Sequence, residues 1–162
     1  MSRFRLREIR ARNYRCFEEL TLPIEEDTTV LFAENGGGKT ALLTALAMGL
    51  AVFQREAPKT TRFSPARDIR LRTVDKRGRR EPVGRCELTW TGDVGETEAV
   101  AWSTTAQPGT RRATDRHRPI LEALERARVP GEPWPLFVWY GVDRLGRQRD
   151  SRRRVERTGD RW

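Results

Sequence analysis

The stretch that decides the fold is AENGGGKT, which occupies residues 33–40. It follows the pattern GxxxxGK(S/T) except at the first position, where Ala33 stands in place of glycine. In such a loop backbone N–H groups converge on phosphate oxygens, glycines let the chain come close, the lysine neutralises the terminal phosphates and the hydroxyl reaches magnesium. The loop therefore predicts a site for a nucleoside triphosphate, and we expect ATP with Mg²⁺.

Ala33 is the one departure from the pattern. Its Cβ would cost about 1–2 kcal/mol if this position needs a left-handed backbone. The cradle would then be looser than usual, although the three glycines downstream could absorb part of the strain. On that premise, Ala33→Gly should tighten nucleotide binding.

The segments on both sides of the loop predict its setting. Residues 28–32, TTVLF, are β-branched and apolar without alternation, which is typical of a strand buried on both faces. Residues 40–53, TALLTALAMGLAVF, are apolar on almost every side and too few to cross a membrane, which favours a helix buried between layers. A strand, a phosphate loop and a buried helix in succession predict an α/β fold of the P-loop NTPase class.

Most of the remaining chain reads as β structure. Residues 4–17 predict an exposed or edge strand, and residues 20–24 a short second strand. Three further strand-like runs are separated by turn signals and suggest an antiparallel meander, namely residues 68–74, 83–91 and 98–104. Residues 55–67 are expected to be a loop or linker, and residues 136–140, LFVWY, a buried strand.

An amphipathic helix is predicted after Asp115, with Pro119 in its first turn. Its apolar stripe consists of Ile120, Leu121, Leu124 and Ala127. His117, the only histidine, is expected to be a surface residue at the helix start, and Glu122 with Arg126 an i,i+4 pair. Of the five tryptophans four lie in or beside strand-like runs, so core packing is favoured over base stacking, namely Trp90, Trp102, Trp134 and Trp139.

The composition indicates a basic protein whose partners could be anionic. Among 162 residues, 32 Lys and Arg face 23 Asp and Glu for a net charge of +9, and all but three of the 32 are arginines. Such a surface attracts phosphate backbones, although a genome that favours arginine codons would give the same excess. Cys16 and Cys86 are far apart, so neither a zinc site nor a disulfide framework is expected. The chain has no run long enough to span a bilayer, and we expect no membrane partner and a cytoplasmic location.

The chain divides by charge into a lobe and a tail. Residues 147–162 hold seven arginines against three acidic residues, and we expect this segment to be disordered or ordered by a partner. Residues 1–146 are predicted to form the P-loop lobe.

Two linked motifs in the first 53 residues resemble the ABC-type ATPase heads of the SMC, RecF and SbcC group. The first is NYRCF, residues 13–17, at the end of the N-terminal strand, and the second is the loop with its following leucines and alanine, ENGGGKTALLTA. The resemblance implies that Lys39 and Thr40 hold the triphosphate and the magnesium ion, and that Arg15 reaches toward the phosphates. It also implies that four residues supply the cradle, namely Asn35, Gly36, Gly37 and Gly38.

The motifs that such heads use for hydrolysis are missing from this sequence. A Walker B strand with its glutamate, a signature serine-glycine motif and a switch histidine are not found, and Asp143 after LFVWY is a poor imitation of the first. No glutamine stands at the expected loop, since Gln148 comes later. We therefore expect only the N-terminal lobe of an ABC-type head, from a truncated or a split ATPase, with a second ATPase chain or a C-terminal lobe as partner.

Two functions stay open at this stage. The first is ATP-Mg binding by a lobe of a DNA-associated ATPase, in DNA repair, chromosome maintenance or phage defence, unable to hydrolyse ATP alone. The second is a non-enzymatic module that binds nucleotide or nucleic acid. A small P-loop kinase or GTPase is disfavoured, because no NKxD motif occurs and residues 13–17 would be unexplained.

Overall fold

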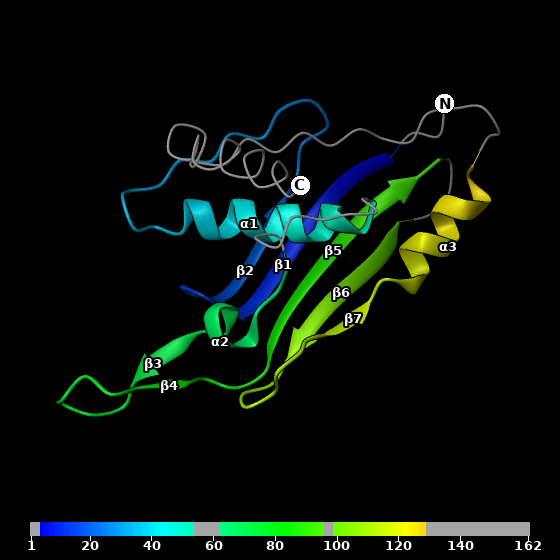
Figure 1. The fold of residues 1–162 in the computed structure, drawn as a ribbon. Coiled ribbons are helices and arrows are strands. Elements are labelled where there is room, and N and C mark those ends of the chain that lie inside the picture. The colour runs from blue at the N-terminus through cyan, green and yellow to red at the C-terminus, as the bar shows by residue number, and fades with distance from the viewer. Residues whose placement is uncertain (1–3, 54–61, 96–98, 129–162) are drawn as a thin grey trace, which may run out of the picture.

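The computed structural model describes residues 4–53, 62–95 and 99–128. Its centre is a five-stranded sheet in the order β2-β1-β5-β6-β7, in which every pair of neighbours is antiparallel (Figure 1). The strands are β1 (Phe4–Tyr14), β2 (Phe17–Pro23), β5 (Cys86–Val94), β6 (Val100–Ala106) and β7 (Thr114–Arg116). The molecule is thus mixed α/β, as predicted, and every strand pairing in its described sheets is antiparallel.

Strand β1 occupies the interior of the sheet, so the prediction of an exposed or edge strand was wrong. It pairs with β2 on one side and with β5 on the other. Ile9 and Ala11 are buried, whereas Arg10 and Arg12 on the opposite face are exposed. The arginines mark one polar face of the strand, because side chains alternate between faces, and they say nothing about its two edges.

The predicted meander is confirmed where β5 pairs with β6, and β7 extends it beyond the predicted runs, but the prediction was wrong for residues 68–74. Strand β3 (Leu71–Thr73) pairs instead with β4 (Arg80–Pro82) in a separate two-stranded sheet. Pro82 has no N–H to donate, and Gly84 has a φ of 136°. These two residues break the extended chain before β5 begins, because neither continues a regular ladder.

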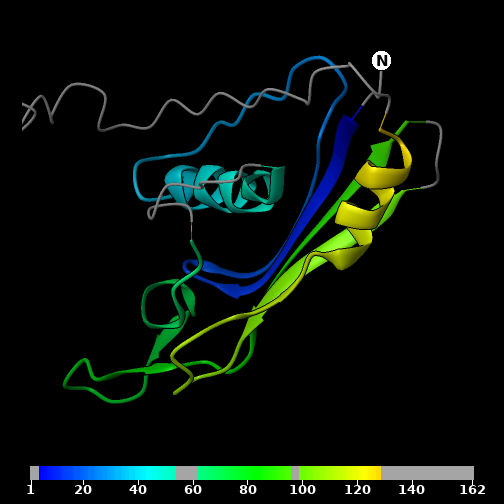
Figure 2. The ribbon, with the colours of Figure 1, turned by 45° about the vertical axis from the view of Figure 1, so that its right-hand side comes forward.

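Helix α1 (Lys39–Leu50) continues into a short 3₁₀ turn, Ala51–Phe53, and packs on one face of the large sheet (Figure 2). Two buried tryptophans of the sheet fasten it there. The indole N–H of Trp90 donates to the Ala45 carbonyl at 3.0 Å, and that of Trp102 donates to the Gly49 carbonyl at 3.1 Å. The two rings are stacked with centroids 6.2 Å apart, which confirms core packing for both residues.

Helix α3 (Arg118–Arg126) has the predicted amphipathic pattern with a shifted stripe. Ile120, Ala123 and Leu124 are buried, but Leu121 is 48% exposed. The expected Glu122–Arg126 pair is absent among the described contacts, and Glu122 instead accepts from Arg118, one turn earlier, at 2.6 Å. His117 lies at the start of the helix, as predicted, but it is half-buried rather than fully exposed.

Residues 28–32 are not a strand, in contrast to the prediction. They have no regular secondary structure, and Val30 and Phe32 are 63% and 91% exposed. An apolar, non-alternating strand needs neighbouring strands at its edges and layers on both faces. The described parts of the chain supply no strand that pairs with this segment.

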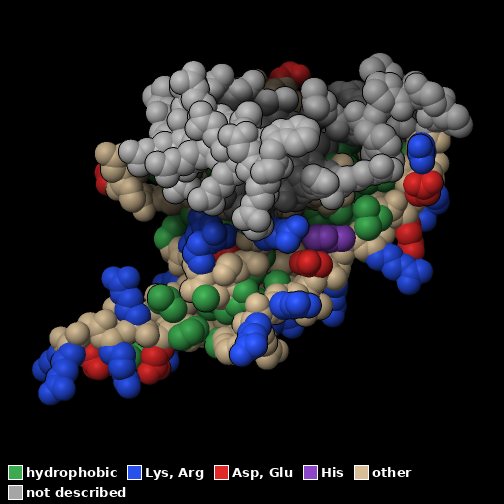
Figure 3. All heavy atoms as spheres, viewed as in Figure 1, with side chains coloured by type: hydrophobic (Ala, Val, Ile, Leu, Met, Phe, Trp, Pro, Cys, Tyr) green, Lys and Arg blue, Asp and Glu red, His purple; other side chains and the backbone are tan. Residues whose placement is uncertain are grey.

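The β3–β4 hairpin projects away from the large sheet (Figure 1). All residues of both strands are exposed. Lys and Arg side chains gather at its end in the space-filling view (Figure 3). The short helix α2 (Pro65–Asp68) precedes the hairpin, so residues 65–67 of the predicted linker are helical and Asp68 is not in a strand. The bridge from Tyr14 to Ile69 ties this region to β1.

Several sequence predictions lie outside the described residues. These are the strand at 136–140 with Asp143, the tail 147–162, Trp134, Trp139 and most of the linker 55–67. In the part that the structure does describe, no helix is both long and apolar enough to cross a bilayer.

Candidate functional site

The predicted phosphate loop, residues 33–40, runs into the first two residues of α1, Lys39 and Thr40. Gly38 precedes the helix with φ 90°, and Gly36 has φ 87°, both in the left-handed region that L side chains rarely adopt. Helix α1 has no side-chain cap and no acidic residue in its first turn. The first amide groups of a helix have no intrahelical acceptor and carry the positive end of its dipole. The start of α1 is therefore open to an anion.

Close packing also requires glycine at two positions of the loop, Gly37 and Gly38. A Cβ on Gly37 would lie 2.9 Å from the Cβ of Ala33 and 3.1 Å from the Glu34 carbonyl oxygen. A Cβ on Gly38 would lie 2.6 Å from both the Cys16 sulfur and the Phe17 ring. The turn that joins β1 to β2 thus lies directly against the loop, which brings the NYRCF motif and the loop together.

Lys39 folds back over the loop. Its ammonium group donates to the carbonyl oxygens of Ala33 and Glu34, the latter at 2.8 Å. The amide of Gly37 donates to the Glu34 carbonyl at 3.0 Å and closes the turn. The lysine is thereby held beside the first helical turn. A phosphate that binds Lys39 would have to replace these two carbonyl oxygens as its hydrogen-bond acceptors.

Ala33 is not strained in this structure, so the premise that we attached to it was wrong. Among the described residues other than glycine, only Asn13 and Arg15 have positive φ, at 50° and 48°. The left-handed conformations of the loop are confined to Gly36 and Gly38. The first position of the loop can therefore accept a Cβ without backbone strain.

Arg15 lies beside the start of α1 but is engaged by protein groups. Its guanidinium donates to an Asp68 carboxylate oxygen at 2.8 Å and to the Thr44 hydroxyl at 3.5 Å, and it stacks over the Tyr14 ring at 5.2 Å. Its backbone amide donates to the Asp68 carbonyl at 2.9 Å. The contact to Thr44 places it one turn beyond Thr40 on the helix, and its role toward phosphate stays a prediction.

Asp68 is the residue of this region that sequence reasoning missed. Its side chain is fully buried and pairs with Arg15 and with Arg67, whose pKa is raised chiefly by this hydrogen bond. It also accepts the Ser64 amide at 2.7 Å. The signal was Ser64-Pro65 followed by an acidic residue, which is the sequence of a capped helix start.

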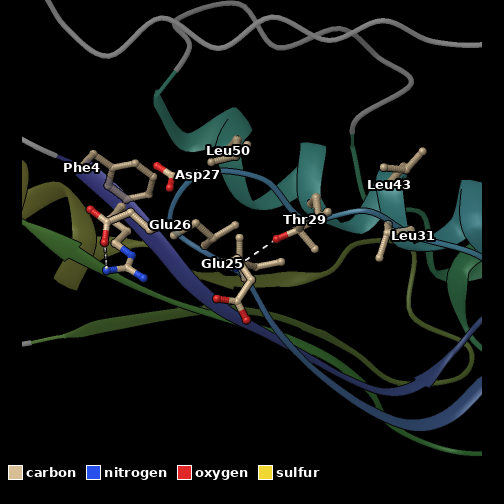
Figure 4. Close-up of a pocket in the computed structure, with 12 residues that line it drawn as sticks. Phe4, Glu25, Glu26, Asp27, Thr29, Leu31, Leu43 and Leu50 are labelled. Atoms are coloured by element: carbon tan, nitrogen blue, oxygen red, sulfur yellow. Dashed lines mark hydrogen bonds and ion pairs between the residues drawn. The ribbon is translucent and has the colours of Figure 1, made fainter.

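A separate cavity of about 430 Å³ lies between residues 24–31 and α1 (Figure 4). Its floor is apolar and includes Leu31, Leu43 and Leu50, while three acidic residues, Glu25, Glu26 and Asp27, lie on its rim. Thr29 fastens the segment by accepting the Glu25 amide at 2.9 Å. Because carboxylates repel phosphate, this cavity is not part of the phosphate site.

The residues present fit ATP with magnesium. The Gly36–Gly38 backbone is shaped for close approach, Lys39 supplies a cation, and Thr40 is exposed with its hydroxyl available to a metal. Within residues 4–53, 62–95 and 99–128, no group of three or more acidic, His or Cys side chains could hold a metal by itself. Magnesium at Thr40 would therefore share its ligands with the phosphates and water, as Mg²⁺ commonly does.

One comparison with known protein families agrees with this geometry. A family model described as an AAA domain matches residues 8–126 of the chain. The match includes the loop, the NYRCF motif, helices α1 and α3, the β3–β4 sheet and all of the large sheet except residues 4–7 of β1.

Proposed function

Because this chain belongs to the AAA domain family, we propose that it binds ATP with Mg²⁺ through residues 33–40. The observation that carries the proposal is the junction of a loop with two left-handed glycines and the uncapped start of α1. Successive amides at such a junction form an anion cradle. Family membership supports nucleotide binding in general, and the loop residues support the triphosphate.

Each loop residue has a task in this proposal. Asn35 and the three glycines surround the phosphates, Lys39 leaves the Ala33 and Glu34 carbonyls for the terminal phosphate oxygens, and Thr40 holds magnesium. Bound magnesium neutralises phosphate charge. Arg15, held by Asp68, stays at the edge of the site within reach of the helix start.

We further propose that this is the N-terminal lobe of a cytoplasmic ABC-type ATPase of the SMC, RecF and SbcC group. The support is the NYRCF turn, whose Cys16 and Phe17 pack against Gly38 of the loop. Hydrolysis would then need groups from a C-terminal lobe or a second chain. The 162 residues alone should bind ATP without turnover at ordinary enzyme rates of about 1 per second or more.

Association with DNA is the third part of the proposal, and the β3–β4 hairpin supports it. Asp75 accepts the amides of Arg77 and Arg79 at 2.9 and 3.0 Å, so the turn is preformed. Lys76, Arg77 and Arg80 are exposed and form no ion pair among the described residues. A rigid projecting hairpin with free cations suits contact with a phosphate backbone, which needs no base-specific groups.

The alternative function is a non-enzymatic nucleotide- or nucleic-acid-binding module. Both functions use the phosphate loop to bind nucleotide, but only an ATPase lobe would gain ATP turnover from a partner chain. ATP turnover by the chain mixed with candidate partner ATPase chains separates them, since only a lobe of an ATPase gains activity from its partner. Turnover by the chain alone that Lys39→Ala abolishes would exclude both.

Titration with a fluorescent ATP analogue and Mg²⁺ tests the nucleotide site directly. Lys39→Ala should bind about tenfold to a hundredfold more weakly, because charge-assisted bonds to phosphate of about 1.5–3 kcal/mol are lost. Lys76→Ala, which removes the same charge at the hairpin, should bind like wild type. Ala33→Gly should also bind like wild type, since Ala33 is unstrained. If Lys39→Ala binds as tightly as Lys76→Ala, the loop is not the phosphate site.

A further inference from the structure

A second cavity, of about 460 Å³, lies at the other end of α1 from the phosphate loop. Met48, Ala51, Val52 and Phe63 give it an apolar wall, and Ala113 continues that wall. Its other lining residues are polar or charged, namely Arg62, Thr104, Arg111, Arg112, Asp115 and His117. The volume falls in the range of small-molecule sites, about 300–1,000 Å³.

The polar wall is organised by buried Thr104. Its hydroxyl donates to an Asp115 carboxylate oxygen at 2.7 Å and lies 3.3 Å from the His117 ring nitrogen Nε2. Thr104 and Asp115 are directly opposite on β6 and β7, which points both side chains to the same face of the sheet. The carboxylate is thus already engaged by Thr104, and burial lowers the pKa of His117 while Asp115 partly opposes this.

The three arginines give the cavity a net positive charge. Arg62, Arg111 and Arg112 form no ion pair among the described residues, and Asp115 is the one acidic side chain in the described lining. The loop that carries Arg111 and Arg112 is held by a turn in which the Thr110 amide and hydroxyl both donate to the Gln107 carbonyl, at 3.2 and 2.7 Å. Figure 3 shows the single histidine on the viewed face of the molecule, with Lys or Arg side chains and an acidic side chain beside it.

We propose that this cavity binds an organic phosphate of nucleoside monophosphate size, separately from the site at residues 33–40. The arginines receive the phosphate, because planar guanidinium forks match its oxygens bidentately. With a neutral histidine, three guanidinium groups and one carboxylate leave two positive charges, which complement the charge of about −1.5 to −2 on a phosphate monoester. The apolar wall of Met48, Val52 and Phe63 receives the uncharged body of the ligand.

The single histidine makes the test simple, because His117 gives the only imidazole signal in an NMR spectrum. AMP and phenyl phosphate are titrated against the Lys39→Ala chain, in which the phosphate loop is disabled, and inorganic phosphate is the third probe. We expect a saturable shift of the His117 signal with both organic phosphates, about tenfold tighter than with inorganic phosphate. The bound phosphate should also raise the pKa of His117, because a nearby negative charge favours the imidazolium.

Two matched variants locate the response. Arg111→Gln with Arg112→Gln should weaken binding at least about tenfold, since two of the three guanidinium partners of the phosphate are removed. Arg116→Gln is the control, because Arg116 neighbours Asp115 on β7 but its side chain points to the opposite face of the sheet. No shift with either organic phosphate, equal affinity for inorganic phosphate, or equal binding by the Arg111/Arg112 variant would overturn the proposal. None of these outcomes concerns ATP binding at residues 33–40, which Lys39→Ala weakens and which the titration with a fluorescent ATP analogue tests separately.

Discussion

At the scale of single residues, the sequence predicted side-chain chemistry well and side-chain partners poorly. The lysine, threonine and glycines of the loop could be read directly, because their spacing is fixed within eight residues. The partner of Arg15 could not, since Asp68 is 53 residues away and meets it only when the helix α2 folds against the β1–β2 turn. The strain assigned to Ala33 was wrong for a related reason, because φ at that position depends on how residues 34–38 turn.

The buried Asp68 should be a main determinant of stability in this region. Asp68→Asn removes the anion shared by Arg15 and Arg67, and Arg15 is only 21% exposed in its side chain. Breaking a buried ion pair costs about 3–5 kcal/mol, so we expect a loss near the lower limit because Arg67 can reach water. Urea unfolding measures the free energy, and Glu122→Gln, which breaks an exposed pair, should change it by less than about 1 kcal/mol. Equal effects of the two variants would contradict a structural role for Asp68.

The two cysteines should differ sharply in reactivity. Cys16 is exposed, whereas burial raises the pKa of Cys86 to about 12. At a pH of about 8.5 iodoacetamide should modify Cys16 in the native chain and Cys86 only after unfolding. The folded state favours the neutral Cys86 thiol, so its contribution to stability is complete below the unfolded pKa of about 8.5 and is lost as the pH rises toward 12. Mass spectrometry of the alkylated peptides decides the matter, and equal labelling of both in the native chain would contradict the burial.

At the scale of elements, the sequence predicted which segments are helices and strands more reliably than how they pair. A strand at β5 and the apolar helix α1 are confirmed, because each is encoded within its own residues. The interior place of β1 was missed, because a strand's polar face is visible in sequence and its edges are not. Residues 28–32 have the composition of a buried strand but no pairing strand among the described residues.

The packing of α1 on the sheet should be most sensitive at Gly49. A Cβ at this position would meet the indole ring of Trp90, with 2.5 Å to Cδ1, so the helix must move away or the ring must turn. We expect Gly49→Ala to destabilise the chain by about 1–3 kcal/mol despite the better helix propensity of alanine. Thermal unfolding measures the loss, with Leu43→Ala, at a residue that is 41% exposed, as a milder control. A Gly49→Ala chain as stable as wild type would show that α1 does not lie this close to Trp90.

At the scale of the whole molecule, the two proposed phosphate sites and the hairpin lie on different elements of one basic chain. The net charge of +9 alone would attract DNA without a defined surface. Variants that remove the same number of positive charges at different places distinguish a defined DNA-binding surface from general electrostatic attraction. Three cations at or beside the turn of the hairpin form no ion pair among the described residues and can be replaced for this purpose, namely Lys76, Arg77 and Arg80.

The salt dependence of duplex DNA binding therefore tests the hairpin. Each protein cation that neutralises a phosphate contributes about 0.9 to the slope of log affinity against log salt concentration. Replacing the three hairpin cations by glutamine should lower that slope by about 2 to 3 if each contacts a phosphate. The control replaces Arg116, Arg118 and Arg126 by glutamine, which gives the same net charge while leaving the hairpin intact. A slope that falls equally in both variants would mean that net charge attracts DNA, whereas a fall confined to the hairpin variant assigns the DNA backbone to β3–β4.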